Sequence, residues 1–157
     1  MPKYSISRKV PFSAEQVFAI SSDVAHYKKF LPLVRQSRVL SREVLADGRE
    51  AIETELKFTY NKLGIQETLL STVTVDKAKL LVLAHSAQGP VKHLDAEWRL
   101  TETGPGSCDI QFNVDYALKS KTLQFVLSGM FDLMVRKVMK AFEARAHELY
   151  GSAVAKV

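Results

Sequence analysis

A strict alternation of apolar and polar residues marks the beginning of the chain. Within residues 3–10, Tyr4, Ile6 and Val10 fall on one side, while lysine and serine residues occupy the other. Successive side chains of a β-strand point to opposite faces of the sheet. This period of two therefore predicts a strand with one buried face.

Two short helices are predicted after this strand. Ser13 is followed three residues later by Gln16, which is the spacing of a capping box. Asp23 is placed to cap a second short helix. That helix must stop near Phe30, because Pro32 has no N–H to donate and disfavours the α conformation in the residue before it.

From this proline to Leu118 the chain has the pattern of β-strands separated by turns. The turn signals are Asp47-Gly48, Asn61 to Gly64, Asp76 to Lys79, Gln88 to Pro90 and Gly104-Pro105-Gly106. They divide the segment into six strands, of which the clearest runs from Cys108 to Leu118 with one apolar and one polar face. Strands joined by short turns form an antiparallel meander.

The last element is predicted to be a long helix from Ser120 to about Tyr150, which Gly151 is placed to end. Its apolar residues recur at steps of three and four and form one continuous stripe: Leu123, Leu127, Met130, Met134, Val138, Phe142, Ala146 and Leu149. The first half is apolar more widely than packing on one sheet requires. The additional residues there are Phe125, Val126, Phe131, Leu133 and Val135. This end either packs on two sides within its own domain or faces a cavity, a partner or a membrane.

These elements predict an α+β fold in which an antiparallel sheet of about seven strands is covered by the long C-terminal helix. No internal repeat, low-complexity segment or linker interrupts the 157 residues, so we expect residues 1–157 to form one domain. A chain of this length buries about 68–70% of the surface that it exposes when unfolded. A large core, with room for a cavity, is therefore expected.

The composition changes this picture only slightly. Hydrophobic residues make up 46% of the chain, and no apolar run approaches the ~18 residues of a membrane-crossing helix. The first residues lack the apolar segment of a secretion signal, and Cys108 is the only cysteine in the sequence, so we expect a reducing compartment, the cytoplasm. The formal net charge of +5 favours anionic partners such as acidic lipid or RNA without choosing between them.

Signatures of catalysis were not found in the sequence. It contains no glycine-rich phosphate loop, no G-x-S-x-G and no H-E-x-x-H, and its four histidines lack metal-ligand spacing. His93 and Asp95 share a strand face and would be an acid–base candidate, but we expect them to point to solvent. His85 is either a strand-end residue in water or a hydrogen-bond donor in a pocket. The sequence predicts no catalytic residue, no metal site and no enzyme.

Four segments resemble a known family. They are Y-S-I-S-R-K-V-P-F-S-A-E-Q-V-F at the start, Y-K-K-F-L-P after the second helix, L-D-A-E-W-R-L in a strand, and V-D-Y-A-L-K-S-K-T-L before the last helix. Together with the order of elements, they are similar to the coenzyme Q-binding family of the START-like superfamily of polyketide cyclases and dehydrases. The resemblance covers about residues 3–151. It implies a helix-grip fold, in which a curved sheet wraps the last helix around an apolar cavity.

The resemblance also implies which residues form the cavity and its mouth. The family's Y-x-x-F-x-P loop falls on Tyr27, Phe30 and Pro32, beside the mouth, and its tryptophan strand falls on Trp98. The residues expected at the cavity or its mouth are Tyr27, Phe30, Leu31, Pro32, Phe58, Tyr60, Trp98, Phe112, Tyr116, Leu127, Met130, Phe131 and Met134. Trp98 and Phe112 fit plain core packing equally well.

Tyr60 and Tyr116 are better candidates for ligand contact, because a phenol near a strand end can pack its ring and donate to a quinone carbonyl. Lys28 and Lys29 are expected to contact the phosphates of an anionic membrane. The loop that carries them would then act as a gate, with its apolar residues meeting the ligand or the bilayer.

The function implied by the resemblance is that of a carrier or chaperone for ubiquinone or a related isoprenoid lipid, in support of respiratory electron transport or quinone biosynthesis. Ubiquinone would be a bound ligand rather than a catalytic cofactor. The partners would be the inner face of the membrane and a respiratory or quinone-biosynthesis enzyme. Two alternatives stay open: a ribosome-binding regulator, because some family members are described as ribosome-association toxins, and a polyketide aromatase or cyclase, which needs a buried acid–base pair.

Overall fold

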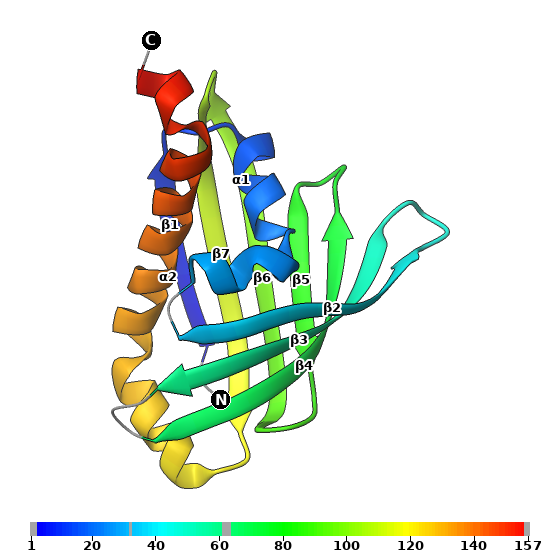
Figure 1. Ribbon diagram of the computed structural model, residues 1–157, viewed down its shortest axis with the longest axis vertical. Coiled ribbons are helices and arrows are strands. Elements are labelled where there is room, and N and C mark those ends of the chain that lie inside the picture. The colour runs from blue at the N-terminus through cyan, green and yellow to red at the C-terminus, as the bar shows by residue number, and fades with distance from the viewer. Residues whose placement is uncertain (1–2, 32, 61–63, 156–157) are drawn as a thin grey trace.

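A curved antiparallel sheet is the framework of the computed structural model (Figure 1). The structure describes residues 3–31, 33–60 and 64–155, and for Tyr60 and residues 151–155 it describes only the backbone. The elements follow in the order β1 (Lys3–Val10), α1 (Ala14–Ser21), η1 (Val24–Lys29), β2 (Val34–Val44), β3 (Glu50–Tyr60), β4 (Ile65–Asp76), β5 (Leu81–Ser86), β6 (Val91–Gly104), β7 (Ser107–Leu118) and α2 (Lys121–Ala155). The predicted order of strand, two short helices, six strands and long helix is confirmed.

The strands lie in the order β1-β7-β6-β5-β4-β3-β2, and all neighbouring pairs are antiparallel. The first strand therefore closes one edge beside β7, and β2 forms the other edge. Register shifts interrupt β2 between Val34 and Gln36 and between Val39 and Ser41. Irregularities of this kind bend a strand and increase its twist. In Figure 1, β2, β3 and β4 accordingly cross obliquely in front of the other strands.

α1 is fixed by the predicted capping box. The backbone N–H of Gln16 donates to Ser13 Oγ at 3.1 Å, and the backbone N–H of Ser13 donates to Gln16 Oε1 at 3.0 Å. Phe12 and Val17, on either side of the cap, are both buried. α1, η1 and α2 all lie on the concave side of the sheet, so they cover one face and leave the other to solvent (Figure 1).

The second short helix, η1, is a 3₁₀ helix, and the prediction that Asp23 caps it is wrong. Asp23 occupies the capping position without making a side-chain capping bond. Its Oδ2 lies 2.6 Å from Nδ1 of His26 instead, because three residues make one turn of a 3₁₀ helix and bring the two side chains together. The predicted stop near Phe30 is confirmed, since η1 ends at Lys29.

Tyr27 anchors this segment to the core. Its side chain is buried, and its hydroxyl donates to the backbone carbonyl of Ser21. The ring lies edge-on to that of Phe142 in α2, with centroids 6.0 Å apart. Burial raises the pKa of Tyr27 above its ordinary value, so the phenol stays protonated and keeps donating.

α2 lies beside β1 and runs the length of the molecule (Figure 1). The prediction that Gly151 ends it is wrong, because the helical backbone continues to Ala155. Glycine permits a C-terminal cap but does not impose one, and the next four residues, S-A-V-A, include no proline. Of the described helices, none combines the length and the apolar character needed to span a membrane.

Buried apolar side chains form two clusters between the sheet and the helices. The larger cluster joins α1, η1 and the C-terminal half of α2 to the sheet, and it includes Phe12, Trp98 and Phe142. The smaller cluster lies against the N-terminal half of α2 and includes Tyr116 and Leu118 of β7. The space between these clusters is incompletely filled, and it forms the candidate site.

Candidate ligand-binding cavity

An apolar cavity lies between the concave face of the sheet and α2. It consists of two lobes of about 230 and 250 Å³, which we call the outer lobe and the inner lobe. The residues that line both lobes are Leu33, Phe58, Leu69, Leu94, Phe131 and Met134. Because the lobes share these residues, we treat them as one site. Its size falls within the roughly 300–1,000 Å³ of small-molecule pockets.

The outer lobe lies where α2 begins. Its further lining residues are Thr59, Ile65, Glu67, Pro90, Val91, Tyr116, Leu118, Leu123, Val126, Leu127 and Met130. The unusually wide apolar stripe predicted for this half of α2 is thus partly explained, since Val126 and Phe131 face the lobe. Phe125 and Leu133 belong to the same predicted set but are exposed.

The inner lobe lies deeper, between η1 and the middle of the sheet. Its further lining residues are Val24, Tyr27, Leu31, Val34, Thr54, Leu56, Ser71, Val73, Val82, Ala84, Ala96, Trp98, Phe112, Val114, Val135 and Val138. The hydroxyl groups in this lining have partners within the protein. Thr54 Oγ1 and Ser71 Oγ lie 2.9 Å apart and hydrogen-bond to each other, and Tyr27 donates to the Ser21 carbonyl.

Tyr116 lines the outer lobe and differs from these residues, because its hydroxyl is buried without a partner among the described residues. The residue is only 2% exposed, and its hydroxyl has no hydrogen-bond partner within the part of the chain that the structure describes. The ring stacks on that of Phe131, with centroids 4.7 Å apart and planes at 24°. Leaving a buried hydroxyl without a partner costs about 1–3 kcal/mol. An acceptor on a ligand that reached this hydroxyl would remove that cost.

Hydrogen bonding between β1 and α2 holds the wall of the outer lobe in place. The hydroxyl of Tyr4 donates to Asp132, which also accepts a hydrogen bond from Arg136 Nε at 2.9 Å. The bond to Asp132 raises the pKa of Tyr4, and the bonds from Tyr4 and Arg136 lower the pKa of Asp132. The Tyr4 ring meets Phe131 edge-on at 5.6 Å. These contacts fasten the helix beside the lobe.

Most of the residues predicted for the cavity line one or both lobes. They are Tyr27, Leu31, Phe58, Trp98, Phe112, Tyr116, Leu127, Met130, Phe131 and Met134. Pro32 and the side chain of Tyr60 lie outside the described residues. Lys28 and Lys29 are exposed on η1.

Phe30 is not brought to the cavity. Its ring packs edge-on against Tyr27 at 5.9 Å and against Phe142 at 5.2 Å, and the guanidinium of Arg145 lies 5.6 Å from its centroid. These contacts turn Phe30 toward the C-terminal half of α2. The expected contact between Phe30 and a ligand or bilayer is therefore not supported by its position.

The sequence interpretation did not single out Leu33, Leu69 or Leu94, which belong to the wall shared by the lobes. Leu94 falls on the apolar face of its strand, so the alternation could have identified it. Leu33 gave no such signal, because it lies in the loop between η1 and β2, where no alternation applies. Its φ of 69° is a conformation that leucine rarely adopts. Its carbonyl accepts a hydrogen bond from the Thr59 N–H at 2.9 Å, which ties the loop to β3.

A larger hollow of about 810 Å³ lies on the opposite, polar face of the sheet. There His85 Nδ1 lies 2.7 Å from Asp95 Oδ1, and both side chains are more than half exposed. His93 Nδ1 is 3.7 Å from the other oxygen of Asp95, so the pair considered from the sequence belongs to this face. Exposed ion pairs of this kind contribute little. No group of histidine, cysteine and acidic side chains that could hold a metal ion occurs among the described residues.

Known proteins resemble this chain over nearly its whole length. Ribosome association toxin RatA of Escherichia coli (strain K12) is 28% identical over 152 residues, which cover 97% of this chain and 91% of the toxin. Coenzyme Q-binding protein COQ10 homolog B, mitochondrial, of Xenopus laevis is 31% identical over 153 residues, which cover 95% of this chain and 59% of that protein. A START superfamily protein from Mycobacterium smegmatis has a TM-score of 0.79 at 22% identity, covering 94% of this chain and 98% of its own.

The predicted resemblance to coenzyme Q-binding proteins and the predicted START-like fold are confirmed by these similarities. The toxins match to a comparable degree, so similarity alone does not choose between a quinone and a ribosome. Residues 10–143 match the family described as polyketide cyclase / dehydrase and lipid transport, and the chain belongs to this family.

Proposed function

We propose that this protein binds ubiquinone or a related isoprenoid quinone in the two-lobed cavity and carries or protects it without changing it chemically. The observation that carries the proposal is the hydroxyl of Tyr116, a buried donor without a partner among the described residues, on a residue that lines the mostly apolar outer lobe. A quinone combines an apolar tail with carbonyl acceptors, which matches this lining. The similarity to COQ10 homolog B supports the same ligand class.

The energetics of transfer explain why one hydrogen bond matters. Burial of a methylene group from water is worth about 0.8 kcal/mol, so a five-carbon isoprene unit supplies up to about 4 kcal/mol. A bilayer offers the tail nearly the same stabilisation. A cavity that takes quinone from a membrane must therefore match lipid around the tail and select the head group by hydrogen bonding.

The ionisable side chains in the described lining favour binding over catalysis. They are Tyr27, Glu67 and Tyr116. A polyketide aromatase or cyclase requires an acid–base pair positioned at the substrate, and the described lining brings no histidine beside a carboxylate. This composition supports a carrier.

A carrier of this kind would work in the cytoplasm at the inner face of the membrane and pass its quinone to a respiratory or quinone-biosynthesis enzyme. Ubiquinone would be its bound ligand and would not serve as a catalytic cofactor. A different hydrophobic small molecule of similar shape would fit the apolar walls equally well, but it would need an acceptor for Tyr116. The head group, rather than the tail, is therefore the part that we expect to define the ligand.

The proposal is tested by solvent extraction of freshly purified full-length protein from quinone-replete cells, followed by mass spectrometry. We expect close to one quinone per chain. Repeated recovery of protein without bound quinone, although the membranes of the same cells contain it, would contradict the proposal.

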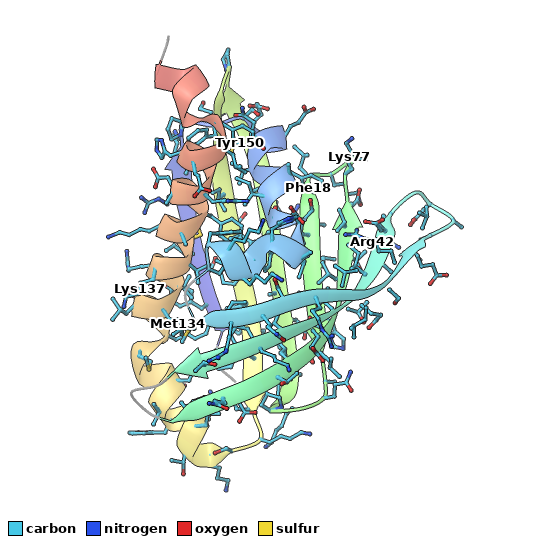
Figure 2. The ribbon with its side chains drawn as sticks, viewed as in Figure 1. Phe18, Arg42, Lys77, Met134, Lys137 and Tyr150 are labelled. Carbon is cyan, nitrogen blue, oxygen red and sulfur yellow. The ribbon has the colours of Figure 1, made fainter. Side chains whose placement is uncertain are left out.

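A ribosome-binding regulator is the second candidate, and one surface feature favours it. A groove of about 510 Å³ between β1 and α2 is lined by Arg8, Arg136, Lys137 and Lys140. Arg8 pairs with Glu143, and Arg136 pairs with the aspartate at position 132. Within the described chain no ion pair involves the two lysines, and Lys137 projects away from the sheet in Figure 2.

The phosphates of ribosomal RNA would complement this groove, and the similarity to RatA supports the same partner. Co-sedimentation with ribosomal subunits tests it. We expect binding that falls steeply as salt rises, and that weakens in a Lys137→Glu, Lys140→Glu double variant. No co-sedimentation at low salt would remove this candidate.

A further inference from the structure

An exposed aromatic residue stands beside the outer lobe. Phe125 is 81% exposed, more than any other large hydrophobic side chain that the structure describes. It lies in the first turns of α2, and its neighbours Leu123, Val126 and Leu127 line the outer lobe from the same turns. Phe125 therefore sits outside the cavity, on the helix that forms its wall.

Three lysines lie close in the sequence to lining residues of the same lobe. Lys92 follows Val91, and Lys119 follows Leu118, both lining residues of the outer lobe. The backbone N–H of Lys119 donates to the carbonyl of Pro90 at 3.0 Å, which holds the two segments together. Lys121 opens α2. All three lysines are exposed, and Glu67 is the acidic residue in the lining of this lobe.

The charge at the start of α2 is unfavourable in the isolated protein. The first turn contains no acidic residue, and lysine at a helix N-terminus opposes the helix dipole. Among the described residues, no ion pair involves any of the three lysines. Anions from outside the protein that bound these lysines would relieve the unfavourable positive charge at the start of α2.

We propose that the lip formed by Lys92, Lys119, Lys121 and Phe125 docks on an anionic lipid bilayer. Phe125 inserts among the lipid chains, the lysines contact lipid phosphates, and the outer lobe faces the hydrocarbon. This inference rests on the proposed function, because it supplies the route by which a lipid-soluble quinone enters. It places the membrane contact at the start of α2 instead of at the lysines of η1.

A bilayer fits this surface better than a protein partner does. The lip combines one large exposed apolar side chain with three exposed lysines, whereas a protein interface usually has an apolar core depleted of charge. It also adjoins the outer lobe, whose mostly apolar lining would suit a lipid. Leu133, the other strongly exposed residue of this half of α2, lines the basic groove instead and adjoins neither lobe.

The test is co-sedimentation of the full chain with vesicles of equal parts phosphatidylcholine and phosphatidylglycerol, and with vesicles of phosphatidylcholine alone. We expect the chain to bind the anionic vesicles, and to bind the vesicles of phosphatidylcholine alone about tenfold more weakly. Phe125→Ser should weaken binding to the anionic vesicles about tenfold. Leu133→Ser, which also replaces an exposed apolar side chain of the same helix with serine, should leave this binding unchanged. Both positions are exposed, so the fold should be kept, which circular dichroism would verify.

A charge-reversal pair separates this surface from the basic groove. Lys119→Glu with Lys121→Glu should abolish vesicle binding, while Lys137→Glu with Lys140→Glu should not. Equal effects of the two pairs, equal effects of the Phe125 and Leu133 variants, or absence of wild-type binding would overturn the proposal. Loss of ribosomal-subunit binding without loss of vesicle binding in the Lys119, Lys121 variant would also overturn it.

Failure of docking and failure of the proposed function can be told apart. Quinone added directly in ethanol bypasses the membrane, and its binding is read from the fluorescence of Trp98, the only tryptophan. Quinone binding without vesicle binding would overturn the docking proposal alone. Vesicle binding by a protein that never binds quinone would support docking. It would overturn the quinone function on which the docking proposal rests.

Discussion

The ring of Tyr116 in β7 stacks on that of Phe131 in α2, with centroids 4.7 Å apart and planes at 24°. This contact joins sheet and helix across the outer lobe. Phe131 also packs edge-on against Tyr4, whose hydroxyl donates to the neighbouring Asp132. The ring of Tyr116 is thus held by an aromatic support, and a selective donor requires such a fixed position.

Removing only this hydroxyl tests its role. We expect Tyr116→Phe to lower the affinity for a short-chain ubiquinone about fivefold, equivalent to roughly 1 kcal/mol for one hydrogen bond. Quenching of Trp98 fluorescence measures the affinity, because Trp98 lines the inner lobe. Stability toward urea should stay the same or rise, because the variant no longer buries an unpartnered hydroxyl.

Tyr4→Phe is the matched control for that substitution. It also removes a phenol hydroxyl next to Phe131, but Tyr4 lines neither lobe and donates to Asp132. Quinone affinity should be unchanged in this variant. Equal losses in the two variants would show that Tyr116 acts through packing and not as a donor to the ligand.

Filling the inner lobe should prevent binding of the tail. Ala96 lines this lobe, and we expect Ala96→Phe to occupy the space that the isoprenoid chain needs. Affinity for a long-chain quinone should fall much more than affinity for the short-chain analogue, with a stability cost of at most about 1–3 kcal/mol. Fluorescence titration and urea unfolding measure the two effects.

The control for the filled lobe is Ala144→Phe, which adds the same ring at an exposed position of α2. It should bind both quinones normally. Undiminished long-chain binding by the Ala96 variant would contradict the assignment of the inner lobe to the tail.

The anchoring bond of Tyr27 should contribute measurably to stability. Tyr27→Phe keeps the ring contacts with Phe30 and Phe142 but leaves the Ser21 carbonyl without its donor. We expect a loss of about 1–3 kcal/mol in the free energy of unfolding. An unchanged urea midpoint would mean that the ring contacts alone hold η1.

Cys108 should be inert in the folded protein. Burial raises the pKa of its thiol from an ordinary 9.0 to about 11. Near neutral pH the folded thiol is protonated, so alkylation by iodoacetamide should be slow until the protein unfolds. Rapid stoichiometric alkylation of the folded chain would contradict this burial.

The same shift has a consequence for stability. Because the unfolded thiol ionises near 9.0 and the folded thiol near 11, the contribution of Cys108 is complete below pH 9 and is lost as the pH rises toward 11. Urea unfolding at alkaline pH, compared with a Cys108→Ala variant, should show this decline only in the wild type.

The sequence predicted the regular elements well, because periods of two and of about 3.6 residues tie side-chain direction to the backbone. For the same reason the wide stripe of α2 gave a cavity wall as one of its alternatives, and Val126 and Phe131 line the outer lobe. Phe30 and Leu33 lie in a loop without such a period. Their directions depend on tertiary contacts, with Phe142 for the first and with β3 for the second.

The central claim is that the cavity holds an isoprenoid quinone whose head group accepts a hydrogen bond from Tyr116. A crystal structure of the full chain with ubiquinone tests it most directly. We expect a quinone carbonyl oxygen at about 2.7–2.8 Å from Tyr116 Oη, with the tail between sheet and α2. A quinone bound on the polar face of the sheet, or a cavity that stays empty at saturating ubiquinone, would contradict the claim.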